Sequence, residues 1–265
     1  MRSQRMRESG DFFEHFLAAP PRQGSNIKPL ARDRRDSQHE HPPVRAMWVA
    51  VACGVAVFLL LAVAVQNGWV DALDQTILVS LRDPSNLGDA WGPVWFEETM
   101  AELSALGGYP ILVTVSIIAL CVLLLLRNGA AALFLFAALS GGAAISSALK
   151  LIFERARPDL VDHLDRTFTS SFPSAHAMVS MLAYLTLAAV AIRFVPRHPV
   201  RIFIPCTAAA LAFIVGASRV YLGVHWPSDV IAGWALGATW ASLCWLAAHY
   251  LSRTANEGTL GHSST

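Results

Sequence analysis

Three short stretches of this chain, far apart in sequence, hold many of the polar residues found at the edges of its long apolar runs. Together they contribute three cations, two histidines, hydroxyl groups and a carboxylate. Such an inventory is suited to holding a phosphate group and transferring its phosphorus to an imidazole nitrogen without a metal ion. The stretches contain Lys150, Arg157 and Pro158, then residues 172–176 (Phe-Pro-Ser-Ala-His), and then Ser218, Arg219, His225 and Asp229.

The composition predicts that membrane-spanning helices position these residues. Of 265 residues, 54% are hydrophobic and only 15% are charged, and six long stretches are almost free of charge. Each is close to the roughly 20 residues that a helix needs to cross the hydrocarbon core. A soluble protein would need amphipathic helices to cover such a core, and none remain. We therefore predict an all-α polytopic membrane protein with spans at residues 46–65, 107–126, 128–150, 173–193, 202–218 and 229–251.

The segments outside these spans set the predicted domain organisation. Residues 1–45 are polar and rich in Arg and Pro, which argues against a signal peptide of the usual layout and predicts a disordered cytoplasmic tail. Residues 46–252 form the predicted catalytic domain, and residues 253–265 form a short cytoplasmic tail. The four cysteines lie in separate apolar runs without paired spacing, so neither a disulfide framework nor a zinc site is expected. No cofactor, metal or nucleic-acid partner is expected, and the oligomeric state stays open.

The alternation of six spans places all three polar stretches on one face of the membrane. Lys150 ends the third span, His176 lies near the start of the fourth, and Arg219 and Asp229 lie between the fifth and sixth. Most of the Lys and Arg residues lie on the other face, together with both termini. The positive-inside rule therefore predicts cytoplasmic termini and a site on the periplasmic or extracellular face of the cell's inner membrane.

The order and spacing of the stretches resemble the three-part signature of the type 2 phosphatidic acid phosphatase (PAP2) superfamily. The match covers residues 150–229 directly, and the six-span layout extends it over roughly residues 46–252. This resemblance implies a PAP2/haloperoxidase-like helical core and phosphatase activity on membrane lipids. The three parts are Lys150, six residues and Arg157-Pro158; Pro173-Ser174-Ala175-His176; and Ser218-Arg219, five residues, His225, three residues and Asp229.

The resemblance also implies the catalytic roles. His225 would be the nucleophile, Asp229 would orient its imidazole, and His176 would be the general acid that protonates the leaving oxygen. The chemistry requires one unprotonated imidazole nitrogen facing phosphorus, which a carboxylate on the N–H of the other nitrogen enforces. Because the two histidines need opposite protonation states, the expected pH profile is bell-shaped.

The other signature residues are predicted to bind the phosphate. Lys150 and Arg157 are seven residues apart and would share a face if the third helix continues that far. Arg219 would supply a third cation. Ser174 and the N–H groups of the next two residues would form an anion site at the start of the fourth helix. The family usually has Gly where this chain has Ala175, whose methyl group disfavours positive φ and narrows the approach to phosphate.

Two other features of the outer face are left outside the predicted site. Arg155 and Arg166 are interpreted as interfacial anchors, the usual role of isolated charges at span ends. Residues 66–108 contain three tryptophans and a mildly amphipathic stretch. They predict an interfacial helix near the catalytic mouth, with a plain connector as an equal alternative.

The predicted function is hydrolysis of a lipid phosphate or pyrophosphate through a phosphohistidine. A site at head-group depth favours a lipid over a soluble substrate. The candidate substrates are undecaprenyl pyrophosphate, phosphatidylglycerophosphate and phosphatidate, among which the sequence does not choose. Two alternatives stay open: a phosphotransferase that passes the same phosphoryl group to a lipid or sugar acceptor, and a non-catalytic lipid transporter.

Overall fold

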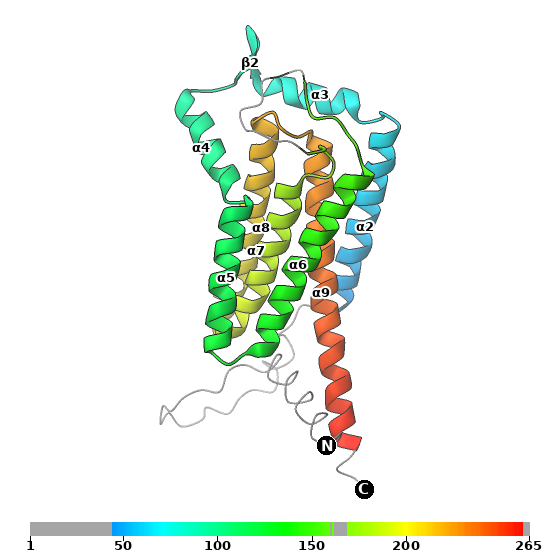
Figure 1. Ribbon diagram of the computed structural model, residues 1–265, viewed down its shortest axis with the longest axis vertical. Coiled ribbons are helices and arrows are strands. Elements are labelled where there is room, and N and C mark those ends of the chain that lie inside the picture. The colour runs from blue at the N-terminus through cyan, green and yellow to red at the C-terminus, as the bar shows by residue number, and fades with distance from the viewer. Residues whose placement is uncertain (1–43, 160, 162–168, 262–265) are drawn as a thin grey trace.

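Long apolar helices run side by side through most of the molecule (Figure 1). The computed structural model describes residues 44–159, 161 and 169–261. Several helix starts follow local signals: α5 and α8 have proline in their first turn, and the side chain of Asn128 accepts a hydrogen bond from the N–H of Ala131 at the start of α6. The long helices are α2 (Val44–Gln66), α5 (Tyr109–Leu125), α6 (Gly129–Ile152), α7 (Ala175–Ala191), α8 (His198–Tyr221) and α9 (Pro227–Gly261), and a 3₁₀ turn (Ile192–Phe194) follows α7.

Shorter elements cover one end of this bundle. They are α3 (Asp71–Ser80), an antiparallel hairpin of β1 (Arg82–Asp83) and β2 (Asn86–Ala90), and α4 (Val94–Ala105). In the hairpin, Arg82 pairs with Ala90 and Asp83 with Asn86. These elements lie at the end where α6 stops and where α7 and α9 start, opposite the start of α2 and the end of α9 (Figure 1). The segment expected to hold one interfacial helix thus contains two helices and a hairpin.

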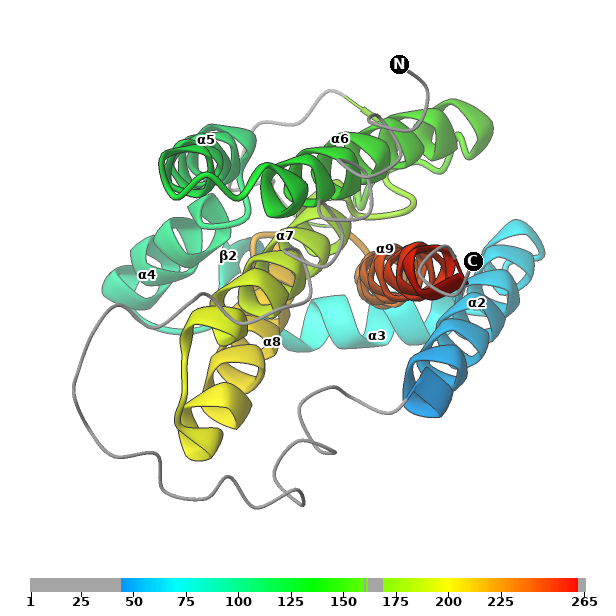
Figure 2. The same cartoon turned by 90° about the horizontal axis from the view of Figure 1, so that it is seen from below.

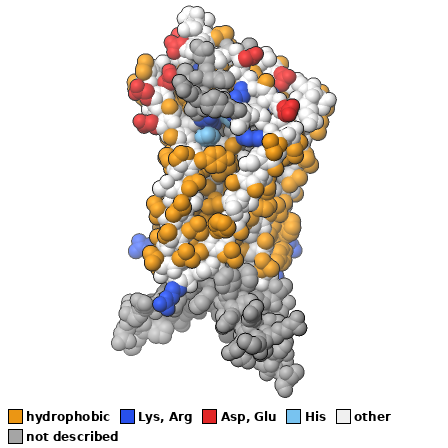
Figure 3. Space-filling view, in the orientation of Figure 1, with side chains coloured by type: hydrophobic (Ala, Val, Ile, Leu, Met, Phe, Trp, Pro, Cys, Tyr) orange, Lys and Arg blue, Asp and Glu red, His pale blue; other side chains and the backbone are white. Residues whose placement is uncertain are grey.

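The prediction of an all-α membrane protein is confirmed. In the described part of the chain, five helices are long and apolar enough to cross a membrane, and the pair α4 and α5, bent by 45°, makes up to six if it acts as one span. On the face shown in Figure 3, apolar side chains form a band across the middle of the molecule, whereas acidic side chains gather at the end that carries α3 and α4. α2 begins at Val44 and α9 continues to Gly261, so both extend past the predicted spans. Residues 1–43 and 262–265 of the predicted tails lie outside the described residues.

Helix α7 occupies the centre of the bundle, between α6, α8 and α9, and α2 packs on the outside of α9 (Figure 2). The contact between α7 and α9 is close because glycines line it. A Cβ atom at Gly233 would lie 2.6 Å from the carbonyl oxygen of Ser174, and one at Gly237 would lie 2.4 Å from that of Met178. In addition, the N–H of Ser174 donates to the carbonyl oxygen of Asp229 at 3.0 Å. The starts of α7 and α9 are therefore fixed against each other.

Substitution of Gly233 by alanine is expected to destabilise this contact. The added methyl group would meet backbone atoms that cannot move independently of α7, and such overpacking costs about 1–3 kcal/mol. Thermal unfolding in detergent should show a lower melting temperature for Gly233→Ala than for the wild type. Gly129→Ala, at the far end of the bundle in the first turn of α6, serves as the control. Equal melting temperatures for the two variants would contradict the tight packing of α7 on α9.

Candidate functional site

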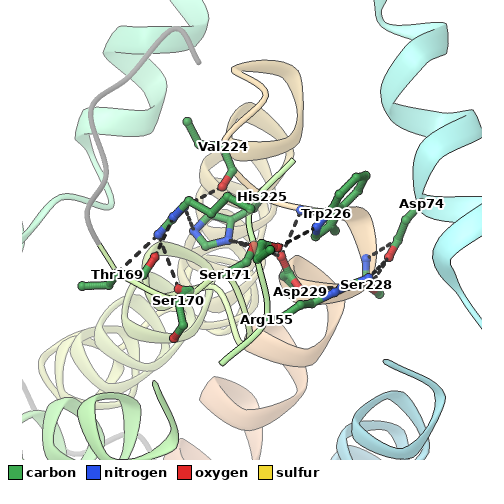
Figure 4. A network of polar contacts seen from close by, with 12 residues as sticks. Asp74, Arg155, Thr169, Ser170, Ser171, Val224, His225, Trp226, Ser228 and Asp229 are labelled. Atoms are coloured by element: carbon green, nitrogen blue, oxygen red, sulfur yellow. Dashed lines mark hydrogen bonds and ion pairs between the residues drawn. The ribbon is translucent and has the colours of Figure 1, made fainter. Parts of the chain in front are cut away.

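The turn between α8 and α9 places His225 and Asp229 together. α9 begins at Pro227, so Asp229 lies in its first turn, where it accepts a hydrogen bond from the backbone N–H of Trp226 at 3.0 Å. The Nδ1 atom of His225 is 3.5 Å from Oδ2 of Asp229, and both side chains are buried. The hydroxyl of Ser171 donates to the same carboxylate oxygen and lies 3.4 Å from Nδ1 (Figure 4). The expected pairing of histidine and carboxylate is present in the structure.

The surroundings of His225 specify which ring nitrogen carries the proton. Nη1 of Arg157 lies 3.2 Å from Nε2 of His225. A guanidinium group only donates hydrogen bonds, so Nε2 is the acceptor and the proton resides on Nδ1, which faces Asp229. Burial lowers the pKa of His225 to about 4, Asp229 opposes this shift, and Arg157 and Arg219 add to it. The site therefore presents a neutral imidazole whose unprotonated nitrogen, Nε2, faces the guanidinium of Arg157.

Lys150 and Arg157 converge, although by a route other than the predicted one. α6 ends at Ile152 and Phe153 is extended, so the premise of a helix continuing to Arg157 is wrong. Nζ of Lys150 instead lies 3.0 Å and Nη2 of Arg157 lies 3.3 Å from the hydroxyl of Thr169. Lys150 also donates to the carbonyl of Ser170, and Nε of Arg157 to that of Thr169. The segment just before α7 therefore gathers both cations.

Ser174 occupies the N-cap position of α7, at the helix start where the sequence predicted it. Its hydroxyl oxygen is buried and has no hydrogen-bond partner among the described residues. A buried hydroxyl without a partner carries a desolvation cost that an incoming phosphate oxygen would remove. The first N–H groups of an α-helix have no carbonyl partner within the helix, so the start of α7 offers further donors at this place.

Ala175 and His176 continue the first turn of α7. In the part of the chain that the structure describes, Arg127 is the sole non-glycine residue with positive φ, so Ala175 needs no glycine-like backbone. Its methyl group is buried, and the concern about positive φ does not apply here. His176 is half-buried and lies two residues after Ser174, at the same end of the bundle as His225.

Arg219 lies in the last turn of α8 and is almost fully buried. Its Nη1 donates to the hydroxyl of Ser104 on α4 at 2.7 Å. Ser104 is also buried. The third predicted cation is thus held by a helix of the outer segment, and this contact has no counterpart in the sequence pattern.

Arg155 belongs to the site, contrary to its interpretation as an interfacial anchor. Its Nη1 lies 2.7 Å from Oδ1 of Asp229 and 2.8 Å from the hydroxyl of Ser228. Arg155 stands two residues before Arg157, inside the spacing of the signature, and that proximity was the available signal. Ser171 was also missed, although it precedes Phe172-Pro173 directly. Arg166 lies outside the described residues.

Fold and site together define a multi-pass α-helical membrane protein whose polar site lies at one end of the bundle. Residues 130–253 match the sequence profile of the PAP2 superfamily. The chain is 30% identical over 186 residues to phosphatidylglycerophosphatase B of Bacillus subtilis, covering 68% of this chain and 85% of that protein. It is 42% identical over 72 residues to an undecaprenyl-diphosphatase of Sulfolobus acidocaldarius, covering 27% of this chain and 30% of the other.

A solved structure supports the same relationship. The crystal structure of a transmembrane PAP2-type phosphatidylglycerolphosphate phosphatase from Bacillus subtilis matches with a TM-score of 0.65 and 28% identity, covering 74% of this chain and 94% of that one. The chain therefore belongs to the PAP2 superfamily, and its relatives are membrane lipid phosphatases.

The low pKa of His225 can be measured directly. Because burial keeps the pKa near 4, the imidazole signal of His225 should not titrate between about pH 5 and 8 in NMR spectra of histidine-labelled protein. The unfolded chain binds this proton near the ordinary pKa of 6.5, so the folded state should lose stability as the pH falls from there toward 4. His225→Gln identifies the signal. A midpoint near 6.5 in the folded protein would contradict the burial.

The role of Ser104 can be separated from that of its helix. Ser104→Ala removes the hydroxyl that accepts from Arg219 and leaves a buried guanidinium N–H without this partner. We expect kcat/KM for a lipid phosphate to fall about tenfold, in line with the loss of one hydrogen bond to a charged group. Thr99→Ala, also on α4, is the matched control, because the hydroxyl of Thr99 donates to the carbonyl of Trp95 in its own helix. An equal effect of both substitutions would argue against the contact.

Proposed function

We propose that this protein hydrolyses a phosphate monoester or pyrophosphate on a lipid head group, through a phosphohistidine at His225. The observation that carries this proposal is the orientation of the His225 ring. Nδ1 faces the buried carboxylate of Asp229, and Nε2 faces the guanidinium of Arg157. A neutral nitrogen aimed into a group of cations is the arrangement that nucleophilic attack on phosphorus requires.

In the proposed reaction, three cations bind the phosphate oxygens. Lys150 and Arg157 converge beside His225, Arg219 contributes through its buried guanidinium, and the hydroxyl of Ser174 donates a further hydrogen bond. Charge on the transferring group spreads over its equatorial oxygens, where such donors stabilise the transition state.

The bond changes then follow in two steps. Nε2 of His225 forms a bond to phosphorus while the bond from phosphorus to the lipid oxygen breaks, and His176 gives its proton to that oxygen. The proton on Nδ1 stays on the phosphorylated ring, whose positive charge Asp229 stabilises. A water molecule then attacks phosphorus and passes a proton to His176. The bond to Nε2 breaks and inorganic phosphate leaves. When the substrate is a pyrophosphate, the group that leaves in the first step is the lipid monophosphate, and the second step is the same.

The position of the site supports a lipid substrate. The site lies at the end of the apolar band, where a head group would reach it while the tail stays in the bilayer (Figure 3). Phosphatidylglycerophosphatase B and undecaprenyl-diphosphatase, the two relatives reported above, suggest the substrates to test first. We also propose that the site faces away from the cytoplasm and that both termini lie inside, since most Lys and Arg residues are on the side of the termini.

Release of inorganic phosphate tests this function. Purified protein in detergent is given phosphatidylglycerophosphate, undecaprenyl pyrophosphate or phosphatidate as the sole substrate, with EDTA present. We expect release from at least one of them, and no release by His225→Ala. Activity that requires an added lipid or sugar acceptor would favour the phosphotransferase. Substrate binding without turnover by the wild type would favour a transporter, and a strict need for Mg²⁺ would contradict the proposed chemistry.

The covalent intermediate needs a separate measurement. Enzyme quenched in alkali after brief exposure to ³²P-labelled substrate should retain acid-labile label, as expected for a phosphohistidine. The label should be absent in His225→Ala. In His176→Ala, label should accumulate when the substrate carries a good leaving group, because that step then needs no general acid. Equal labelling of wild type and His225→Ala would show that another residue is the nucleophile.

A further inference from the structure

A chain of buried charges connects the site to the outer helix α3. Nη1 of Arg155 lies 2.7 Å from Oδ1 of Asp229, and its Nη2 lies 2.8 Å from Oδ2 of Asp74 on α3. Asp74 and Asp229 are both buried, and the side chain of Arg155 is only 12% exposed. Asp71, one turn earlier on α3, lies 3.1 Å from the same nitrogen but is 53% exposed. Two buried carboxylates thus share one guanidinium.

Asp74 also holds the first turn of α9. Its Oδ1 accepts the backbone N–H of Ser228 at 2.9 Å, and its Oδ2 accepts the hydroxyl of the same residue (Figure 4). The early N–H groups of a helix need acceptors from outside the helix, and here the acceptor comes from α3, 154 residues earlier in the chain. Asp229 is the next residue, so α3 and the carboxylate that faces His225 are linked through both backbone and side chains.

The two oxygens of Asp229 have separate partners. Oδ1 accepts from Arg155, whereas Oδ2 accepts from the N–H of Trp226 and the hydroxyl of Ser171 and faces Nδ1 of His225. A carboxylate can rotate about its Cβ–Cγ bond unless both oxygens are bound. The guanidinium of Arg155 also makes a cation–π contact with Trp226: its Cζ lies 5.5 Å from the centroid of the indole ring. The arrangement leaves Oδ2 in one position.

We propose that Arg155 and Asp74 are positioning residues. They fix the carboxylate of Asp229 toward His225 and hold the turn between α8 and α9 against α3. Neither residue touches the substrate in this scheme. Arg155 acts on the orientation of Asp229, and Asp74 acts on Arg155 and on Ser228. The inference rests on the proposed function, because it assigns to Asp229 the role of orienting the His225 ring.

Arg155 and Asp74 carry opposite charges, so their effects on the pKa of His225 can be distinguished. Asp229 of α9 raises the pKa of His225, whereas Arg157 of the loop after α6 and Arg219 of α8 lower it. Lys150 of α6 lies near the same Asp229 and Arg157. Arg155 contacts Oδ1 of Asp229, and behind it lie the carboxylates of α3. Removing the positive charge of Arg155 stabilises a protonated His225, which raises the pKa of that ring. Removing the negative charge of Asp74 has the opposite effect and lowers the pKa of His225. A purely structural role would give both substitutions the same effect.

The experiment compares Arg155→Met, Arg155→Lys and Asp74→Asn with the control Asp89→Asn, an exposed carboxylate on the same outer face. With a substrate that the wild type hydrolyses, we expect kcat to fall about 10- to 100-fold for Arg155→Met, with KM changed less than about threefold. The loss should be smaller for Arg155→Lys, because lysine keeps the positive charge but cannot contact Asp74 and Asp229 through two separate nitrogens. Asp74→Asn should lower kcat, and Asp89→Asn should leave it unchanged.

The pH dependence supplies the decisive readout. The acid limb of kcat should move to higher pH in Arg155→Met and should not do so in Asp74→Asn. NMR titration of His225 should show the same directions whether or not the protein turns over, so the result does not depend on activity. Unchanged kcat and unchanged His225 titration in Arg155→Met would overturn the inference. If Arg155→Met does not fold, Arg155→Lys and Asp74→Asn decide, and wild-type kinetics in both would also overturn it. If the wild type itself releases no phosphate from the substrates tested, the proposed function is contradicted instead.

Discussion

The buried carboxylate of Asp229 is the interaction on which the rest of the site depends. A charge removed from water is tolerated only when partners replace its hydration, and this one has partners from three parts of the chain. The backbone N–H of Trp226 precedes it, Ser171 comes from the segment before α7, and Arg155 comes from the loop after α6. Each partner is also close in sequence to another residue of the site: Trp226 follows His225, Ser171 lies three residues before Ser174, and Arg155 lies two residues before Arg157. The energetic need to satisfy one carboxylate therefore brings the three polar stretches together.

Close packing of α7 on α9 supports the same arrangement from the bundle side. Gly233 and Gly237 allow the two helices to approach until side-chain-free surfaces of α9 touch the backbone of α7. The start of α7, with the buried hydroxyl of Ser174, is consequently held in place by the hydrogen bond from the N–H of Ser174 to the carbonyl oxygen of Asp229. In a membrane, where apolar surfaces gain little by meeting each other, this kind of contact between small residues is a main source of helix association.

The outer segment does more than connect two spans. α3 supplies Asp74 to Arg155 and to the first turn of α9, and α4 supplies Ser104 to Arg219. Two of the cations at the site therefore depend on residues of the segment between α2 and α5. A buried guanidinium needs several acceptors in fixed positions, and α3 and α4 each provide part of them.

The sequence by itself determined the membrane class, the three polar stretches and their common face. Long uncharged runs and the alternation of spans depend only on local composition and order, so no tertiary information is needed to find them. Block spacing likewise led to His225, Asp229 and the family. Only the tertiary structure decided that Lys150 and Arg157 meet at Thr169 rather than along a continuous helix, that Ala175 is in a helical turn, and that Arg155 binds Asp229. These contacts join residues separated by 12 to 74 positions, and their partners are chosen by burial and hydrogen-bond geometry, which a linear pattern does not contain.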